Sequence, residues 1–409
     1  MEHKINKTQS QSMLHTFLFE PNVYMCLLAS LEGNITTEEI EDAVKKAYTQ
    51  NETTMSKVIL DRENVYFQNM HQTGCHVFRD NRSWQEIRKE CEKDAFRINE
   101  GELFRTYIIE EEKGYTLMMM VHHIAADGKA MVILLNDILN NLAGRKVEFK
   151  PLTSEGSELV PRDKEVSFPI MTLIRYLNHV WQKTGRMFGW EDYYEIHKRF
   201  WKVWESEVRF ESIGKEELEQ IKEECKEKGI TVNSYMMAKI LEKHPEYHNV
   251  CFPISLRREN RSITNRVLLV KTDFKYNVKK TFWENAEKLH NITREFIENK
   301  DKKYDIALRV RWMDTGLLDS SLMYTFCGYE NKVSKLLAEL IGYSGKRKTH
   351  LTVTNLTNID VDKNYGRFQV KSVAAIAPTM SAGKNVVCIG TFDGKMTIAY
   401  TKMKRKEQL

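Results

Sequence analysis

The sequence has little that could cross-link the chain or bind a metal. It contains seven cysteines, an odd number, and no two of them form a Cys-x-x-Cys pair. This spacing argues against a disulfide framework and against a zinc cluster. Free thiols suit a reducing compartment. We therefore expect a cytoplasmic protein without a metal site.

Long apolar runs and a strong net charge are also absent. No apolar run approaches the roughly 20 residues that cross a bilayer, and the polar N-terminus lacks the apolar core of a signal peptide. The 62 basic and 57 acidic residues leave a net charge of only +5. So small a surplus does not favour nucleic-acid binding. We expect no transmembrane segment and no nucleic-acid partner.

Two common catalytic motifs are missing. The chain has no Gly-x-Ser-x-Gly sequence, and Gly342–Lys346 lacks the spacing of a phosphate-binding loop. These absences exclude a serine nucleophile of the α/β-hydrolase type and a P-loop nucleotide site.

Strand and helix patterns alternate along the chain. Thr36 and Glu39 fit a capping box at a helix start. Val58–Leu60 and Val65–Phe67 flank a polar turn and predict a hairpin. Tyr115–Val121 is nearly all apolar, which predicts a central strand buried on both faces. Similar patterns predict further strands at Tyr24–Leu31, Phe104–Glu110, Val250–Ser255, Val267–Phe274, Leu351–Asn355, Phe368–Ala377, Val386–Thr391 and Met396–Thr401, and further helices at Trp84–Ala95, Ala130–Leu142, Lys215–Lys228, Val232–Lys243 and Phe282–Asn299.

A polar stretch divides the chain into two α/β halves. Gly144–Ser167 contains glycine and proline among polar residues and is typical of a linker. Ile170–Trp204 follows and is rich in tryptophan, tyrosine and phenylalanine. We interpret it as helices packed across a domain junction, with a membrane-surface helix or a lid as the alternatives. The predicted parts are an N-terminal lobe (1–160), a linker with the aromatic helices (161–210) and a C-terminal lobe (211–409).

The chemistry centres on the segment from His122 to Gly128, which reads His-His-Ile-Ala-Ala-Asp-Gly. It lies between the predicted central strand and a helix, where α/β folds place functional residues. An imidazole with a pKa near 6.5 can accept and return a proton at neutral pH. A structural histidine or a metal ligand is the alternative. Adjacent strand residues point to opposite faces, so His122 and His123 cannot easily share one metal.

The motif resembles the HHxxxDG signature of the chloramphenicol acetyltransferase-like superfamily, which includes condensation domains of peptide synthetases, alcohol acyltransferases and wax ester synthases. Weaker similarities follow in the family's order. They are Phe96–Arg105, where Glu102 replaces the usual proline, Val232–Ala238, where Ser234 replaces aspartate, and the segments Phe252–Arg257 and Val353–Leu356. The Asp-Phe-Gly-Trp-Gly motif of plant members is absent.

The resemblance implies an α/β fold of two similar lobes, forming a V with a tunnel at the interface. His123 would be the general base, and His122 would be structural. Asp127 would pair with Arg257 and hold the loop. Gly128 would permit a tight turn into the helix. Asn355 and Ser381 are candidates for the oxyanion or for the tunnel lining.

Three functions compete. The first is acyl transfer from acyl-CoA to a small alcohol or amine by direct attack, without an acyl-enzyme. The second is a free-standing condensation enzyme that uses acyl groups on a carrier protein, and the third is an inactive binding protein of the same fold. We expect the thioester to serve as co-substrate, no permanent cofactor, and a monomer. Peripheral membrane contact is left open.

Overall fold

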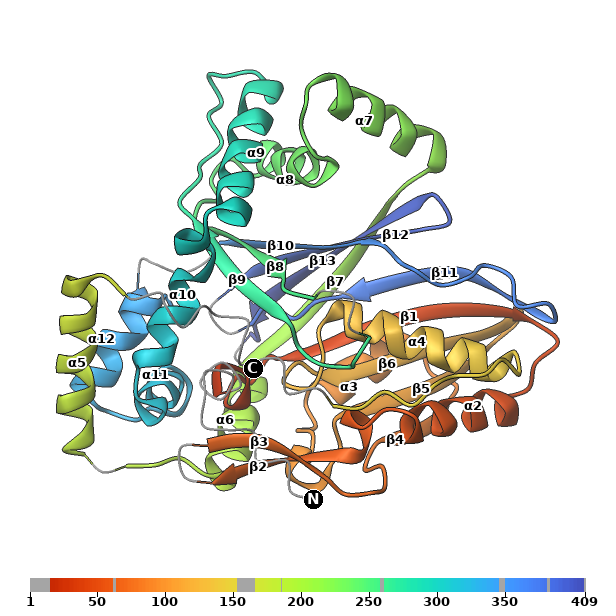
Figure 1. The fold of residues 1–409 in the computed structure, drawn as a ribbon, viewed down its shortest axis with the longest axis horizontal. Coiled ribbons are helices and arrows are strands. Elements are labelled where there is room, and N and C mark those ends of the chain that lie inside the picture. The colour runs from red at the N-terminus through yellow and green to blue at the C-terminus, as the bar shows by residue number, and fades with distance from the viewer. Residues whose placement is uncertain are drawn as a thin grey trace.

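The computed structural model describes residues 15–61, 64–152, 166–184, 186–257, 261–345, 350–380 and 383–407. Two mixed β-sheets with helices packed around them form two lobes, one above the other in Figure 1. This arrangement confirms the predicted two-lobed α/β fold.

The first lobe is built on a five-stranded sheet in the order β11-β1-β6-β5-β4. Its central strand, β6 (Gly114–His122), is the predicted buried strand, and seven consecutive residues from Thr116 to His122 are buried. The other elements of the lobe are β1 (Tyr24–Gly33), α2 (Thr37–Thr49), β4 (His76–Asp80), α3 (Trp84–Cys91), β5 (Phe104–Glu111) and α4 (Gly128–Leu142), with a separate ribbon of β2 (Ser56–Asp61) and β3 (Asn64–Asn69).

The second lobe is built on a six-stranded sheet in the order β7-β13-β12-β10-β8-β9. Its core is a second apolar cluster that joins α7, α8 and α9 to the strands. The elements are β7 (Trp204–Ile213), α7 (Lys215–Glu227), α8 (Val232–Lys243), β8 (Val250–Ser255), β9 (Val267–Thr272), α9 (Phe282–Glu298), β10 (Leu351–Asn358), β12 (Asn385–Phe392) and β13 (Lys395–Arg405).

One strand crosses from the second half of the chain to the first sheet. β11 (Phe368–Ile376) pairs antiparallel with β1 and forms an edge of the first sheet. β7, which starts inside the predicted linker, pairs with β13 over its whole length. The predicted boundaries at residues 160 and 210 stay a prediction, but the sheets interlock across them.

A group of helices lies beside the two sheets. α5 (Phe168–Gln182) and α6 (Trp190–Val203) cover most of the aromatic segment, and α10 (Lys300–Trp312), α11 (Thr315–Cys327) and α12 (Lys332–Ile341) complete the group. The indole of Trp201 is buried and donates to the carbonyl of Pro21 at 2.9 Å. Tyr193 donates to the carbonyl of Phe96 at 2.9 Å. These contacts agree with the interpretation that the aromatic segment packs between parts of the chain.

Local patterns in the sequence have the expected structural outcome. Thr36 and Glu39 form the capping box of α2. The predicted β2–β3 hairpin is present. The predictions omitted β4, β7, α10, α11 and α12.

Candidate functional site

The predicted motif lies in a short loop between β6 and α4. β6 ends at His122, and Asp127 is the N-cap of α4. The Asp127 carboxylate accepts a hydrogen bond from the Ala130 amide at 2.8 Å. This cap satisfies one of the amides that are free at a helix start. The aspartate therefore fixes where the strand-to-helix loop ends.

His123 is held by hydrogen bonds on three sides. Its amide donates to the Val23 carbonyl at 3.1 Å, and its own carbonyl accepts from the Asn265 side-chain amide at 2.7 Å. Its Nδ1 lies 2.8 Å from the Ala126 carbonyl. A carbonyl oxygen can only accept, so Nδ1 carries the proton of the neutral ring. The lone pair of the neutral imidazole is therefore on Nε2.

The surroundings of His123 favour a neutral ring. The side chain is half-buried, and the Phe17 ring lies 4.9 Å away between centroids. Burial lowers the pKa of His123 below its usual 6.5, although the Ala126 carbonyl and the Asp127 charge act in the opposite direction. A neutral imidazole at pH 7 can accept a proton. The geometry and the charge state both suit a general base.

His122 lies in a different environment. It is fully buried, with the rings of Tyr24, Phe96 and Tyr193 within 6.5 Å between centroids. Its Nδ1 accepts from the Ile124 amide at 3.2 Å, and burial holds its pKa well below 6.5. A neutral ring enclosed in this way packs the strand end and is not open to a substrate.

The predicted ion pair between the lobes is present. Arg257 follows β8, and its Nη2 lies 3.1 and 3.0 Å from the two carboxylate oxygens of Asp127. Asp127 also accepts from the Arg266 amide at 2.8 Å. The guanidinium donates further to the carbonyls of Ser262 and Thr264, at 2.7 and 2.6 Å. The pair is nearly inaccessible to solvent and joins the α4 loop to the loop before β9.

The role expected for Gly128 was wrong in its physical reason. Gly128 is not among the glycines with positive φ, so no turn requires it. A Cβ at this position would instead lie 2.4 Å from Cδ2 of Leu356 on β10. Glycine therefore lets the start of α4 approach the second lobe closely.

Of the two oxyanion candidates, only Asn355 is among the described residues. Asn355 lies on β10. Its side-chain nitrogen donates to the side-chain oxygen of Asn233 at 3.2 Å, and its side-chain oxygen accepts from the Thr357 backbone amide at 2.7 Å. Its contacts among the described residues do not include His123. Ser381 lies outside the described residues.

Asn265 is a site residue that the sequence did not reveal. It lies directly before Arg266, and its amide nitrogen is 3.1 Å from Nδ1 of His123 as well as bonded to the His123 carbonyl. The two residues are 142 positions apart, and no motif marks Asn265. Its position close to Arg257 was the one available signal, because the family resemblance placed Arg257 near the motif loop.

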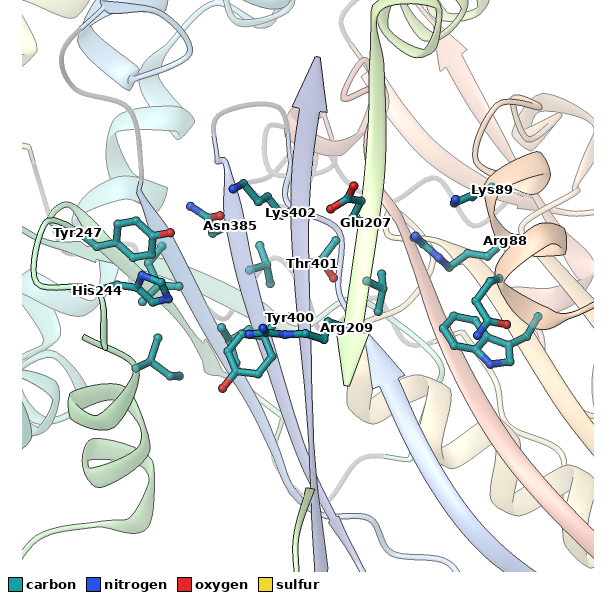
Figure 2. A pocket seen from close by; sticks show the side chains of 17 residues that line it. Arg88, Lys89, Glu207, Arg209, His244, Tyr247, Asn385, Tyr400, Thr401 and Lys402 are labelled. Carbon is teal, nitrogen blue, oxygen red and sulfur yellow. The ribbon is translucent and has the colours of Figure 1, made fainter. Parts of the chain in front are cut away.

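A cavity of about 480 Å³ lies over the second sheet (Figure 2). Residues of α3, including Arg88, lie on one side, and His244 and Tyr247 lie on the other. His123 is not one of its lining residues, so the tunnel predicted at the motif stays a prediction. In the described part of the chain, no cluster of three or more His, Cys, Asp or Glu residues could hold a metal. No helix there is both long and apolar enough to cross a membrane.

Comparisons with known proteins agree with this fold. The family model of the condensation domain matches residues 2–155. No curated protein matches the sequence. A solved structure of polyketide synthase associated protein 5 from Mycobacterium tuberculosis is similar over 98% of this chain and 94% of its own, with a TM-score of 0.63 and 12% identity.

Two further solved structures are similar to this chain in fold. The first condensation domain of the calcium-dependent antibiotic synthetase, with a substrate analogue, covers 98% of this chain and 91% of its own, at a TM-score of 0.63 and 12% identity. The EpoB cyclization-docking bidomain from Sorangium cellulosum is similar over 96% of this chain and 79% of its own. Its TM-score is 0.59 and its sequence identity is 12%. Identities this low concern the fold. The chain thus has the fold of condensation domains, which confirms the fold expected from the resemblance seen in the sequence.

Proposed function

We propose that this protein is an acyltransferase that moves an acyl group from a thioester to an alcohol or amine, with His123 as the general base. The observation that carries the proposal is the contact between His123 Nδ1 and the Ala126 carbonyl, from which we infer the tautomer of His123. Its Nδ1–H is held by the Ala126 carbonyl at 2.8 Å, which leaves Nε2 as the basic nitrogen. His122, Asp127, Gly128 and Arg257 would support the loop.

The proposed reaction proceeds by direct attack. Nε2 of His123 takes the proton of the acceptor O–H or N–H as the acceptor attacks the thioester carbonyl carbon. The tetrahedral intermediate then collapses, the C–S bond breaks, and the thiolate receives the proton from Nε2. The Ala126 carbonyl stabilises the transient imidazolium through Nδ1–H. No acyl-enzyme forms in this scheme.

The negative charge on the intermediate needs hydrogen-bond donors. Asn355 stays a candidate, because an amide nitrogen has two N–H groups and Asn233 engages only one. Ser381 is the other candidate. A buried donor aimed at the oxyanion typically contributes 10²–10³-fold to the rate.

Acyl-CoA is the donor we propose first, and an acyl group on a carrier protein is the second candidate. The second candidate is favoured by the family match over residues 2–155 and by the condensation-type domains among the similar structures. In both cases the thioester is a co-substrate and the acceptor is a small molecule. The third candidate, an inactive binding protein, gives no reason for the intact network around His123 and Asp127.

One experiment separates the three candidates. The protein is incubated with acyl-CoAs and a panel of alcohols and amines, and the free thiol is measured, with the His123→Ala variant in parallel. Thiol release that needs an acceptor and is lost in the variant supports acyl-CoA as donor. Activity only with a loaded carrier protein supports the second candidate. No turnover with any donor would contradict the proposal.

A further inference from the structure

Helix α5 presents apolar side chains to solvent on the face opposite to its packed face. Phe168, Tyr176 and Leu173 are 81%, 61% and 40% exposed. The other face of α5 is buried through Ile174, Leu177 and Trp181. Phe168 and Tyr176 are eight residues apart, which places them about 80° apart around the helix, on its exposed side. Exposed apolar side chains that gather on one face of a helix are a mark of an interaction surface.

Helix α5 itself carries no negative charge. From Phe168 to Trp190 the sequence has no aspartate or glutamate, although acidic residues number 57 in 409 over the chain. The side chains of Arg175 and Lys183 are exposed, and neither side chain forms a hydrogen bond or an ion pair with a described residue. The exposed face therefore combines aromatic rings with unpaired cations.

The position of α5 leaves this face accessible. α5 is the outermost helix of the helical group, at the left edge of Figure 1. Asn178 fastens α5 to the corner between α10 and α11, where its amide donates to the Trp312 carbonyl at 2.8 Å and its oxygen accepts from the Asp314 amide at 2.9 Å. Trp312 is 45% exposed beside it. A large exposed ring on the neighbouring helix extends the apolar surface.

We propose that the α5 surface, made of Phe168, Leu173, Arg175, Tyr176 and Lys183, binds the surface of an anionic lipid bilayer. Aromatic rings favour the boundary between headgroups and acyl chains, and lysine and arginine attract anionic headgroups. Because no described helix could span a bilayer, the contact is peripheral. An acidic protein would satisfy the cations but would leave side chains as exposed as Phe168 and Tyr176 without an apolar partner. The inference does not depend on the proposed acyl transfer.

The test is co-sedimentation of the full chain with vesicles of phosphatidylcholine alone or with one quarter phosphatidylglycerol. We expect binding to the anionic vesicles, weakened by high salt because exposed charges are screened. Phe168→Ser with Tyr176→Ser should lower the partition coefficient about tenfold or more, since each ring buried in the interface contributes strongly. Arg175→Glu with Lys183→Glu should remove the preference for anionic vesicles.

The matched control is Val278→Ser with Ile297→Ser, which removes two apolar side chains that are 72% and 54% exposed outside α5. This variant should bind vesicles as the unmodified chain does. Circular dichroism and thermal unfolding check that each variant is folded. The proposal is overturned if the chain does not bind vesicles or binds both kinds of vesicle equally. It is also overturned if Phe168→Ser with Tyr176→Ser leaves the binding unchanged. Capture by an acidic carrier protein without vesicle binding would also overturn it, as would self-association through α5.

Discussion

At the scale of single residues, the direction of one hydrogen bond decides the chemistry of His123. The Ala126 carbonyl fixes the proton on Nδ1, and the backbone contacts to Val23 and Asn265 hold the residue in place. A ring held in this way keeps its orientation when Nε2 takes a proton. His122, one residue earlier, is enclosed by rings, which separates a packing histidine from a reactive one.

His123→Ala should lower the rate of acyl transfer about 10²–10⁴-fold, because this is the usual contribution of a general base. In the unmodified chain, kcat/KM should fall on the acid side as His123 becomes protonated. Because burial lowers its pKa, that fall should be centred below pH 6.5. His179→Ala, at an exposed position of α5, is the control and should retain full activity. A His123→Ala variant with normal activity would disprove the assignment.

Asn265→Asp should act through the position and charge of His123. The substitution replaces the amide donor near Nδ1 with a negative charge, which favours the imidazolium and raises the pKa of His123. The acid-side fall of kcat/KM should therefore move to higher pH, whereas Asn265→Ala should lower kcat about tenfold without that upward move. If the pH profiles of both variants match the unmodified chain, Asn265 has only a structural role.

At the scale of elements, the start of α4 is the point where the two lobes are joined. Asp127 caps the helix and binds Arg257 and the Arg266 amide from the other lobe. Gly128 lets Leu356 of β10 pack against the same turn. The motif loop is thus fixed from both lobes at once.

Arg257→Met should lower the free energy of unfolding by about 3–5 kcal/mol, because it leaves a buried carboxylate without its cation. Urea denaturation gives the value. Adding Asp127→Asn in the same chain should recover part of the loss, since the unpaired charge is then gone. If the two losses simply add, the residues do not interact in the folded state.

Gly128→Ala should destabilise the junction by about 1–3 kcal/mol, the usual cost of overpacking. The added methyl group meets Leu356, so Leu356→Ala in the same chain should relieve the clash. Thermal unfolding of the single and double variants measures this. A Gly128→Ala variant as stable as the unmodified chain would show that the contact relaxes freely.

At the scale of the whole molecule, buried neutral histidines make the fold sensitive to acid. Burial lowers the pKa of His197 to about 3 and holds that of His122 well below 6.5. The unfolded chain binds protons at these residues from about pH 6.5 downwards, whereas the folded chain does not. The stability that these neutral histidines contribute is therefore fully present above pH 6.5 and decreases as the pH falls. For His197 the decrease continues until the pH reaches its folded-state pKa of about 3.

The free energy of unfolding, measured by urea denaturation between pH 7.5 and 5, should fall as the pH falls. The slope should approach about 1.4 kcal/mol per pH unit for each such histidine about one unit below pH 6.5. His197→Phe keeps a ring of similar size and should make this slope shallower. His179→Phe, at an exposed position, should leave the slope unchanged. An unaltered slope in His197→Phe would mean that His197 titrates normally.

Much of the fold could be predicted because its signals are local. The capping box of α2, the β2–β3 hairpin and the buried strand β6 each depend on residues within a few positions of one another. α10 and α11 escaped prediction because their apolar residues do not gather on one face. In α11, even Asp319, Ser320 and Ser321 are buried. β11 was recognised as a strand, but its partner β1 lies more than 300 residues away.

The sequence by itself determined most of the lobes' strands and helices, the motif loop and, through a family resemblance, the pairing of Asp127 with Arg257. Only the tertiary structure decided which nitrogen of His123 is basic, why residue 128 is glycine, and that Asn265 belongs to the site. The reason is physical. Strand and helix signals arise between neighbouring residues, whereas a hydrogen bond across 142 positions or a methyl group's clearance exists only once the two lobes have packed.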